Sequence, residues 1–150
     1  MNTGTVLSSL ASIAIGVLVG YAAFYFRGAL ARREQIAKSL SDFYASAATV
    51  YYSARDYQRS PESEGERLTY YKLFDQHYKE FLSASTLLVS LVEPGLREEV
   101  LRIEDAWDEI SEGGFVAVPG KKWFDMLDAI RYKILDKIAY SRLTDPFWRS

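Results

Sequence analysis

The chain has 150 residues, which suits one modest domain or a small domain with one appended segment. Its formal net charge of -2 gives no general attraction to nucleic acid, so we expect no nucleic-acid partner. The absence of cysteine excludes disulfides, thiolate metal sites and cysteine nucleophiles.

The charged residues are distributed unevenly. Residues 1–26 contain no charged side chain, and the first one is Arg27. A helix over residues 5–26 would extend about 33 Å, enough to cross a hydrocarbon core of about 30 Å. The segment also lacks the polar stripe of a surface helix in a soluble domain. We therefore predict a transmembrane anchor over residues 1–27 and a cytoplasmic helical bundle over residues 28–150.

The basic residues that follow the apolar segment predict its orientation. Arg27, Arg32, Arg33 and Lys38 come after it, and no basic residue comes before it. Because positive charge is retained on the cytoplasmic side, we expect a single-pass inner-membrane protein with its N-terminus outside and its C-terminal domain in the cytoplasm. The four basic residues would lie at the lipid boundary, where each attracts anionic membrane lipid by about 1 kcal/mol.

A cleaved secretion signal is the main alternative for this segment. Residues 29–31, Ala-Leu-Ala, have the small residues of a cleavage site. A secretion signal also requires a basic region before a short apolar core of about 7–15 residues, and the segment has neither. The sequence therefore favours a span that stays in the membrane over a signal or the buried helix of a soluble core.

Small residues recur at every fourth position of the predicted span, at Ser8, Ser12, Gly16 and Gly20. Such a face lets two helix backbones approach closely, and the last two form the G-x-x-x-G pattern of paired spans. Glycine is also frequent in spans generally. Association through this face therefore stays open, and its partner would be a second copy of the chain or another membrane protein.

The rest of the chain predicts an antiparallel helical bundle. Apolar residues spaced three and four apart run from Ile36 to Tyr57, with no strong break after the span. Further helices are predicted from about Glu66 to Val92, Leu96 to Glu112 and Lys121 to Leu143. The fold class is therefore all-α, with a single N-terminal transmembrane helix continuing into an antiparallel cytoplasmic bundle of about four helices.

The order of these helices places two segments near the membrane. The first cytoplasmic helix leads away from the bilayer, the second returns, the third leaves and the fourth returns. The turn at residues 93–95 and the tail at residues 147–149 would then lie near the lipid surface. We assign Trp148 to the lipid boundary because tryptophan suits the headgroup layer, although the tail could instead cover a gap in the bundle.

Catalytic and metal-binding groups do not converge in the sequence. The single histidine, His77, lies on the apolar face of its predicted helix, where we expect a core histidine bonded to a neighbouring hydroxyl or carbonyl. Asp125, Asp128 and Asp136 alternate with basic residues, which favours ion pairing over cation binding. We expect no enzymatic activity, no cofactor and no metal site.

Tyrosines and one acidic helix face are the remaining candidates for a binding surface. The chain has 11 tyrosines, which can form a contact surface but more often pack at the edge of a core. Acidic residues from Glu98 to Glu112 follow the outer face of the third predicted helix; such a face is usually solvated, and it could dock a basic partner.

Two functions from different classes fit these features. The first is a membrane-anchored interaction module, an accessory, scaffold or sensor-effector subunit that binds a protein partner or self-associates through its span. The second is an effector that perturbs membranes by clustering its transmembrane helices. The anchor together with the missing catalytic motifs favours the first.

Overall fold

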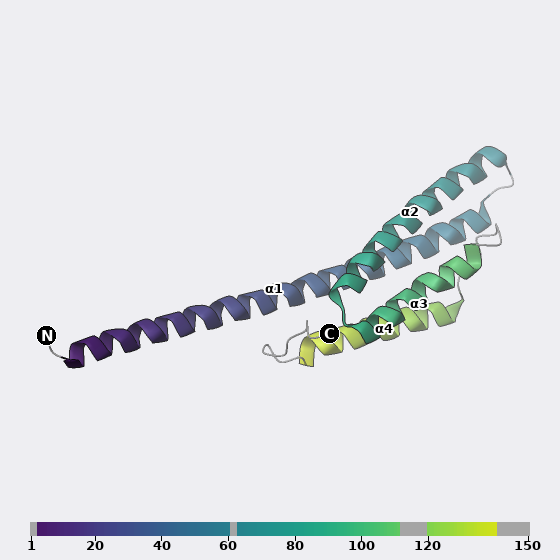
Figure 1. The fold of residues 1–150 in the computed structure, drawn as a ribbon. Helices are drawn as coiled ribbons and strands as arrows, with labels where there is room; N and C mark the ends of the chain where they lie inside the picture. Colours follow the sequence, from purple (N-terminus) through teal and green to yellow (C-terminus); the bar gives the residue numbers. More distant parts are fainter. Residues whose placement is uncertain (1–2, 61–62, 112–119, 141–150) are drawn as a thin grey trace.

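The computed structural model describes residues 3–60, 63–111 and 120–140, with side chains for residues 13–60, 63, 65–107 and 120–139. Every element in these ranges is an α-helix. The helices, labelled in Figure 1, are α1 (Thr3–Arg59), α2 (Glu64–Leu91), α3 (Pro94–Ser111) and α4 (Lys121–Tyr140). The prediction of an all-α chain with four packed helices is confirmed.

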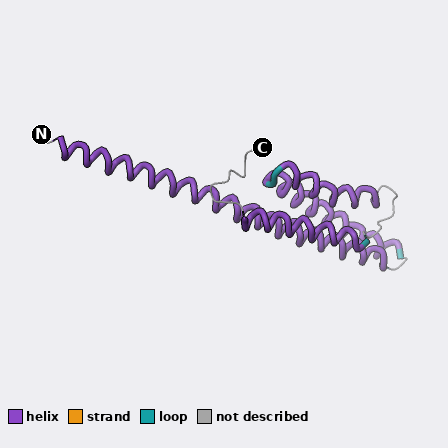
Figure 2. Tube along the Cα trace, turned by 90° about the horizontal axis from the view of Figure 1, so that it is seen from below, coloured by secondary structure: helices purple, strands orange, loops and turns teal. Residues whose placement is uncertain are grey.

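Helix α1 joins the apolar segment to the bundle without a break. It has 57 residues and is therefore about 85 Å long. Gly28, a weak helix former between the apolar segment and the bundle, lies inside the continuous helix. Ile36 is the first buried apolar side chain described along α1, so only the C-terminal half belongs to the bundle. Figure 1 and Figure 2 both show the N-terminal half projecting beyond the other helices.

The four helices form an antiparallel bundle in which each contacts two neighbours. Helices α1 and α3 each contact both α2 and α4. The link between α2 and α3 and the end of α4 both lie at the end of the bundle from which α1 projects (Figure 1). Lys137 of α4 pairs with Glu93 of that link. The predicted alternation of helix directions is therefore confirmed, whereas the placement of these helices relative to a bilayer stays a prediction and residues 147–149 lie outside the described residues.

The predicted apolar stripes form the core. In α1 the buried stripe consists of Ile36, Leu40, Phe43, Ala47, Val50 and Ala54. Small side chains, among them Ser53 of α1 and Ser85 of α2, are buried between the helices. Small residues let helix backbones approach, and α1 and α2 form the most extensive contact among the helix pairs described. Phe43 and Phe81 then stack with ring centroids 5.5 Å apart.

Aromatic rings fill the part of the core between α3 and α4. Trp107 and Trp123 cross edge to face with their centroids 5.5 Å apart. The Nε1 of Trp123 donates a hydrogen bond to the carbonyl of Ile103 at 3.2 Å, which satisfies its polar atom inside the core. Tyr51 of α1 packs edge to face on Phe124 at 4.5 Å. These rings tie α4 to both α3 and α1.

Helix α2 begins two residues earlier than predicted. Ser63 occupies the N-cap position with extended backbone at φ -66° and ψ 123°. Its hydroxyl donates to Oε2 of Glu66 at 2.8 Å, a contact between the Ser and Glu of an S-x-x-E pattern. The Ser63 side chain makes no capping hydrogen bond to the backbone; the Ser63 carbonyl accepts the N–H of Arg67 at 3.1 Å, and the helix begins at Glu64.

Helix α3 also begins earlier, at Pro94. Proline is favoured at the first helical position because the N–H that it lacks would have no partner within the helix. The carbonyl of Glu93 accepts the N–H groups of Leu96 and Arg97, both at 3.1 Å. The expectation that residues 93–95 all break the chain was therefore wrong, and the break is confined to Val92 and Glu93.

Candidate functional site

The N-terminal half of α1 is the strongest candidate for a functional feature. Its large apolar side chains from Ile13 to Phe24 are exposed, and the fraction reaches 78% at Phe24. Contiguous apolar surface of this extent is unfavourable in water. This helix is the one in the described chain that is long and apolar enough to cross a membrane, and none of its most apolar stretch is buried. A membrane span and an N-terminal secretion signal share these properties.

The small-residue face of this segment is sterically open. A Cβ atom built at Gly16 or Gly20 meets no heavy atom within 4 Å. Ser8 and Ser12 lie on the same continuous helix, eight and four residues before Gly16, but their side chains are outside those described. The spacing keeps the four positions on one face. Packing of a second helix there stays a prediction.

The predicted lipid-boundary residues follow on α1. Arg27 and Lys38 are exposed, whereas Arg32 and Arg33 are half-buried. Four basic residues against one acidic residue give residues 27–38 a formal charge of +3. Trp148 lies outside the described residues, so its place at the boundary stays a prediction.

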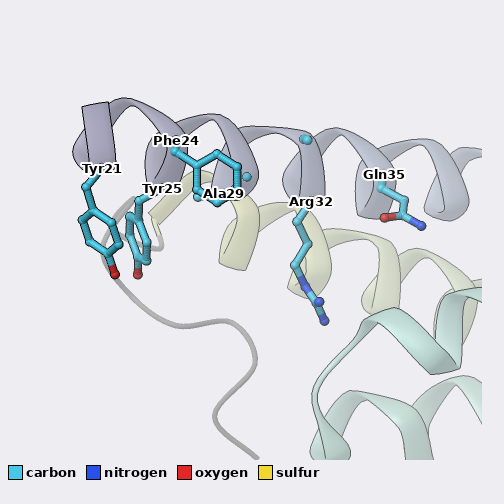
Figure 3. Close-up of a pocket in the computed structure, with 8 residues that line it drawn as sticks. Tyr21, Phe24, Tyr25, Ala29, Arg32 and Gln35 are labelled. Atoms are coloured by element: carbon cyan, nitrogen blue, oxygen red, sulfur yellow. The ribbon is translucent and has the colours of Figure 1, made fainter. Parts of the chain in front are cut away.

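An open groove runs along α1 at this boundary, and the sequence analysis did not identify it. The groove has a volume of about 470 Å³. Its described lining residues all belong to α1: Tyr21, Phe24, Tyr25, Gly28, Ala29, Ala31, Arg32 and Gln35. Figure 3 shows Tyr21, Tyr25 and Arg32 projecting to the same side of the helix, the side on which the other helices lie. The lining positions Tyr21, Tyr25, Gly28 and Arg32 are spaced three or four residues apart, and this spacing in the sequence could have indicated that they share one face of the helix.

Arg32 supplies the charge of this groove. Among the described lining residues it alone is charged. Its Nε atom is buried and has no hydrogen-bond partner among the described residues. A buried donor without an acceptor costs about 1–3 kcal/mol, so the site favours an acceptor beyond those that the described residues supply.

A second polar cluster joins α1 to α4. The hydroxyl of Tyr44 donates to Oδ1 of Asp128 at 2.8 Å, and the Arg131 guanidinium lies 4.8 Å from the centre of the Tyr44 ring. The hydrogen bond to Asp128 is the main cause that raises the pKa of Tyr44 above its ordinary value, and burial and the Asp128 charge add to it. Tyr44 is therefore held in its protonated form, which suits a structural tie between helices.

Lysines of α4 pair with carboxylates of α3 and of the link before it. The Nζ of Lys133 lies 2.7 Å from a carboxylate oxygen of Glu99 in α3, and Lys137 pairs with Glu93 in the link. These lysines therefore pair between segments, and the ion pairing predicted for Asp125, Asp128 and Asp136 stays a prediction. Asp128 instead accepts the Tyr44 hydrogen bond. Within the described ranges, no group of three or more histidine and carboxylate side chains is placed to hold a metal ion.

His77 differs from its predicted role. It is half-buried on α2, and its buried Nδ1 has no hydrogen-bond partner among the described residues. A core histidine bonded to a neighbouring hydroxyl or carbonyl was expected, and Nδ1 forms no such bond with the described residues. The neighbours one turn away on the same face are Phe74 and Phe81, whose buried rings offer no acceptor.

The tyrosines divide into two groups. Partly buried tyrosines pack against the core, as expected at its edge: Tyr44, Tyr51, Tyr57 and Tyr78. Tyr52 and Tyr132 instead project into solvent, with 57% and 71% of their surface exposed.

On the acidic face of α3, the side chains of Glu98 and Asp105 are exposed, and the carboxylate of Glu99 forms an ion pair with Lys133.

Comparison with models of protein families, with curated proteins and with solved structures finds no match for this chain. Function must therefore be inferred from its own residues and geometry.

Proposed function

We propose that this chain is a single-pass membrane-anchored interaction module. The N-terminal half of α1 lies in the inner membrane, and the bundle binds a protein partner on the cytoplasmic side as an accessory, scaffold or sensor-effector subunit. The observation that carries this proposal is the continuity of α1, in which one helix has an exposed apolar half and a half that builds the core.

The same continuity supports a retained span over a cleaved signal. Cleavage after Ala31 would cut the chain inside an uninterrupted helix, five residues before the buried Ile36. The segment also has no basic residue before its apolar core, which a secretion signal requires. The basic cluster after the apolar segment supports a cytoplasmic bundle and an external N-terminus.

The bundle surface supports binding rather than catalysis. Large apolar side chains are exposed near its membrane-distal end, including Tyr52 at 57%, Leu68 at 54% and Tyr71 at 46%. Aromatic and aliphatic residues of this kind are enriched in the centres of protein interfaces. The described polar clusters, around Asp128 and Glu99, join helices to one another.

Membrane insertion can be tested by placing charge on the proposed span. Ile15 and Val19 are exposed at 61% and 62%, so replacing both with lysine leaves the bundle core untouched. Each lysine near the centre of a span costs about 2.5–3.5 kcal/mol of insertion free energy. We expect the wild-type chain to resist alkaline extraction from membranes and the double variant to be released.

The matched control places two lysines on the bundle, at Tyr52 and Tyr132, which are equally exposed. This control should remain in the membrane fraction. Extraction of the wild-type chain as a soluble protein, or equal retention of both double variants, would refute the anchor.

A further inference from the structure

We propose that the groove along α1, lined by Tyr21, Tyr25, Gly28, Arg32 and Gln35, binds one anionic phospholipid, with the Arg32 guanidinium holding the phosphate. This inference rests on the proposed membrane anchor, because only an inserted α1 brings the groove to the headgroup layer. It goes beyond general attraction to the membrane surface, since it assigns one lipid molecule to one built site.

The position of Arg32 matches the depth of a lipid phosphate. The uncharged segment ends at Phe26, and Arg32 lies six residues further along the helix, about 9 Å beyond the end of the hydrocarbon. The polar headgroup layer on each side of a bilayer occupies about 5–8 Å, so the reach of the arginine side chain covers this layer. Gln35 follows one turn later and adds an amide donor.

The polarity of the groove follows that of a lipid. The lining extends over 15 positions from Tyr21 to Gln35, about 21 Å along the helix axis, of which about 8 Å lies on the hydrocarbon side of Phe26 and about 14 Å on the bundle side. Aromatic rings line the end nearest the hydrocarbon, and Arg32 and Gln35 line the end nearest the bundle. An acyl chain would fit against the aromatic end of the groove, and a phosphate would fit against the end that holds Arg32 and Gln35.

Small residues provide the space between these ends. Gly28, Ala29 and Ala31 line the middle of the groove, and a Cβ built at Gly28 meets no atom within 4 Å. A larger side chain at this position would project into the groove. The glycerol region of a lipid therefore has room where the aromatic and polar ends meet.

The charge of the site favours an anionic lipid over a zwitterionic one. Arg32 has a buried Nε without a partner among the described residues, and a phosphate oxygen is a strong acceptor for it. Residues 27–38 carry a formal charge of +3, which a phosphatidylglycerol headgroup balances better than phosphatidylcholine. A guanidinium can also bind phosphate through two parallel N–H groups, which a lysine cannot do.

The test measures retained lipid on the full chain by native mass spectrometry after exchange into detergent with equal phosphatidylglycerol and phosphatidylcholine. We expect one phosphatidylglycerol to be retained preferentially. Arg32→Gln should reduce this preference about tenfold, as expected for one charge-assisted hydrogen-bonded contact, and Arg32→Lys should restore only part of it. The matched control, Arg27→Gln, removes the same charge from an exposed position outside the groove, so it should cost only diffuse attraction and lower the preference clearly less than Arg32→Gln does.

Equal loss of preference in Arg32→Gln and Arg27→Gln would overturn the proposal, because it would indicate diffuse attraction only. Competition of the bound lipid by millimolar inorganic phosphate would overturn the lipid assignment and identify a phosphate site. A parallel alkaline extraction of each variant separates the two proposals: an inserted chain without lipid preference refutes the lipid site alone, whereas an extracted chain refutes both.

Discussion

The hydroxyl of Tyr44 on α1 donates a 2.8 Å hydrogen bond to Asp128 on α4, and this contact links positions 84 residues apart. It lies on the α1–α4 interface, where Arg131 covers the tyrosine ring. We expect Tyr44→Phe to lower the free energy of unfolding by about 1 kcal/mol, because it removes the hydrogen bond and keeps the ring. Urea unfolding of the full chain in detergent checks this. Tyr132→Phe, at a position 71% exposed, is the control and should match the wild type.

The same hydrogen bond predicts a dependence on alkaline pH. The pKa of Tyr44 in the folded chain is raised above its ordinary value of 10.0, mainly by the hydrogen bond to Asp128. A raised pKa means that the folded state holds the proton more tightly, so this stabilisation is complete below about pH 10 and is lost as pH rises through the folded pKa. The difference in unfolding free energy between wild type and Tyr44→Phe should be constant from pH 7 to about pH 9 and shrink above it. A difference that grows in that alkaline range would contradict the assignment.

Phe81 tests whether the predicted stripes form one core. Its side chain is fully buried and stacks on Phe43, with the ring centroids 5.5 Å apart. Phe81→Ala should therefore destabilise the bundle by about 3–5 kcal/mol. Leu87→Ala, on the same helix at a position 46% exposed, should change the unfolding free energy by less than about 0.5 kcal/mol. Similar losses in both variants would mean that α2 is not packed through the Phe81 face.

The open glycine face predicts association of the span. Because a Cβ at Gly16 or Gly20 meets no atom of the described residues within 4 Å, we expect that replacing both with leucine obstructs a neighbouring molecule rather than the chain itself. We expect cross-linked oligomers in membranes to decrease. Ala14→Leu with Ala22→Leu adds similar bulk on a different face and is the control. Unchanged cross-linking in the glycine variant would remove the proposed packing role of these two residues.

The same glycine variant separates the two functions considered for the chain. An effector that clusters its spans should cause dye leakage and growth arrest on overexpression, and the leucine substitutions should abolish both effects. An interaction module should be harmless when overproduced and correctly inserted. Leakage that depends on Gly16 and Gly20 would therefore favour the effector over the interaction module.

The fold was predictable because its signals are local and periodic. The stripe from Ile36 to Ala54 is buried as its spacing indicated, and the large apolar side chains of the uncharged segment are exposed from Ile13 to Phe24, where it is described. Helix starts were less predictable, because they depend on single capping residues. The helices that follow Ser63 and that start at Pro94 each begin about two residues before the predicted start, within the usual variation of helix ends.

The candidate site was less accessible from the sequence. The basic residues at the boundary were identified by their position after the span, but the groove beside Arg32 depends on which side of α1 faces the other helices. The partners of Tyr44 and Lys133 lie 84 and 34 residues away in the chain. Such pairings are set by helix register in the bundle, which apolar periodicity alone does not specify.

The most direct test of the membrane anchor uses the fact that the chain contains no cysteine. Single-cysteine variants Asn2→Cys and Tyr132→Cys are expressed in a bacterial host and treated with a membrane-impermeant maleimide, and the intact mass of each purified chain is measured. We predict that the Asn2→Cys chain is labelled in intact cells, that the Tyr132→Cys chain is labelled only after permeabilisation, and that both masses include residues 1–27. Labelling of the Tyr132→Cys chain in intact cells, or a mature chain that lacks the apolar segment, would contradict the account.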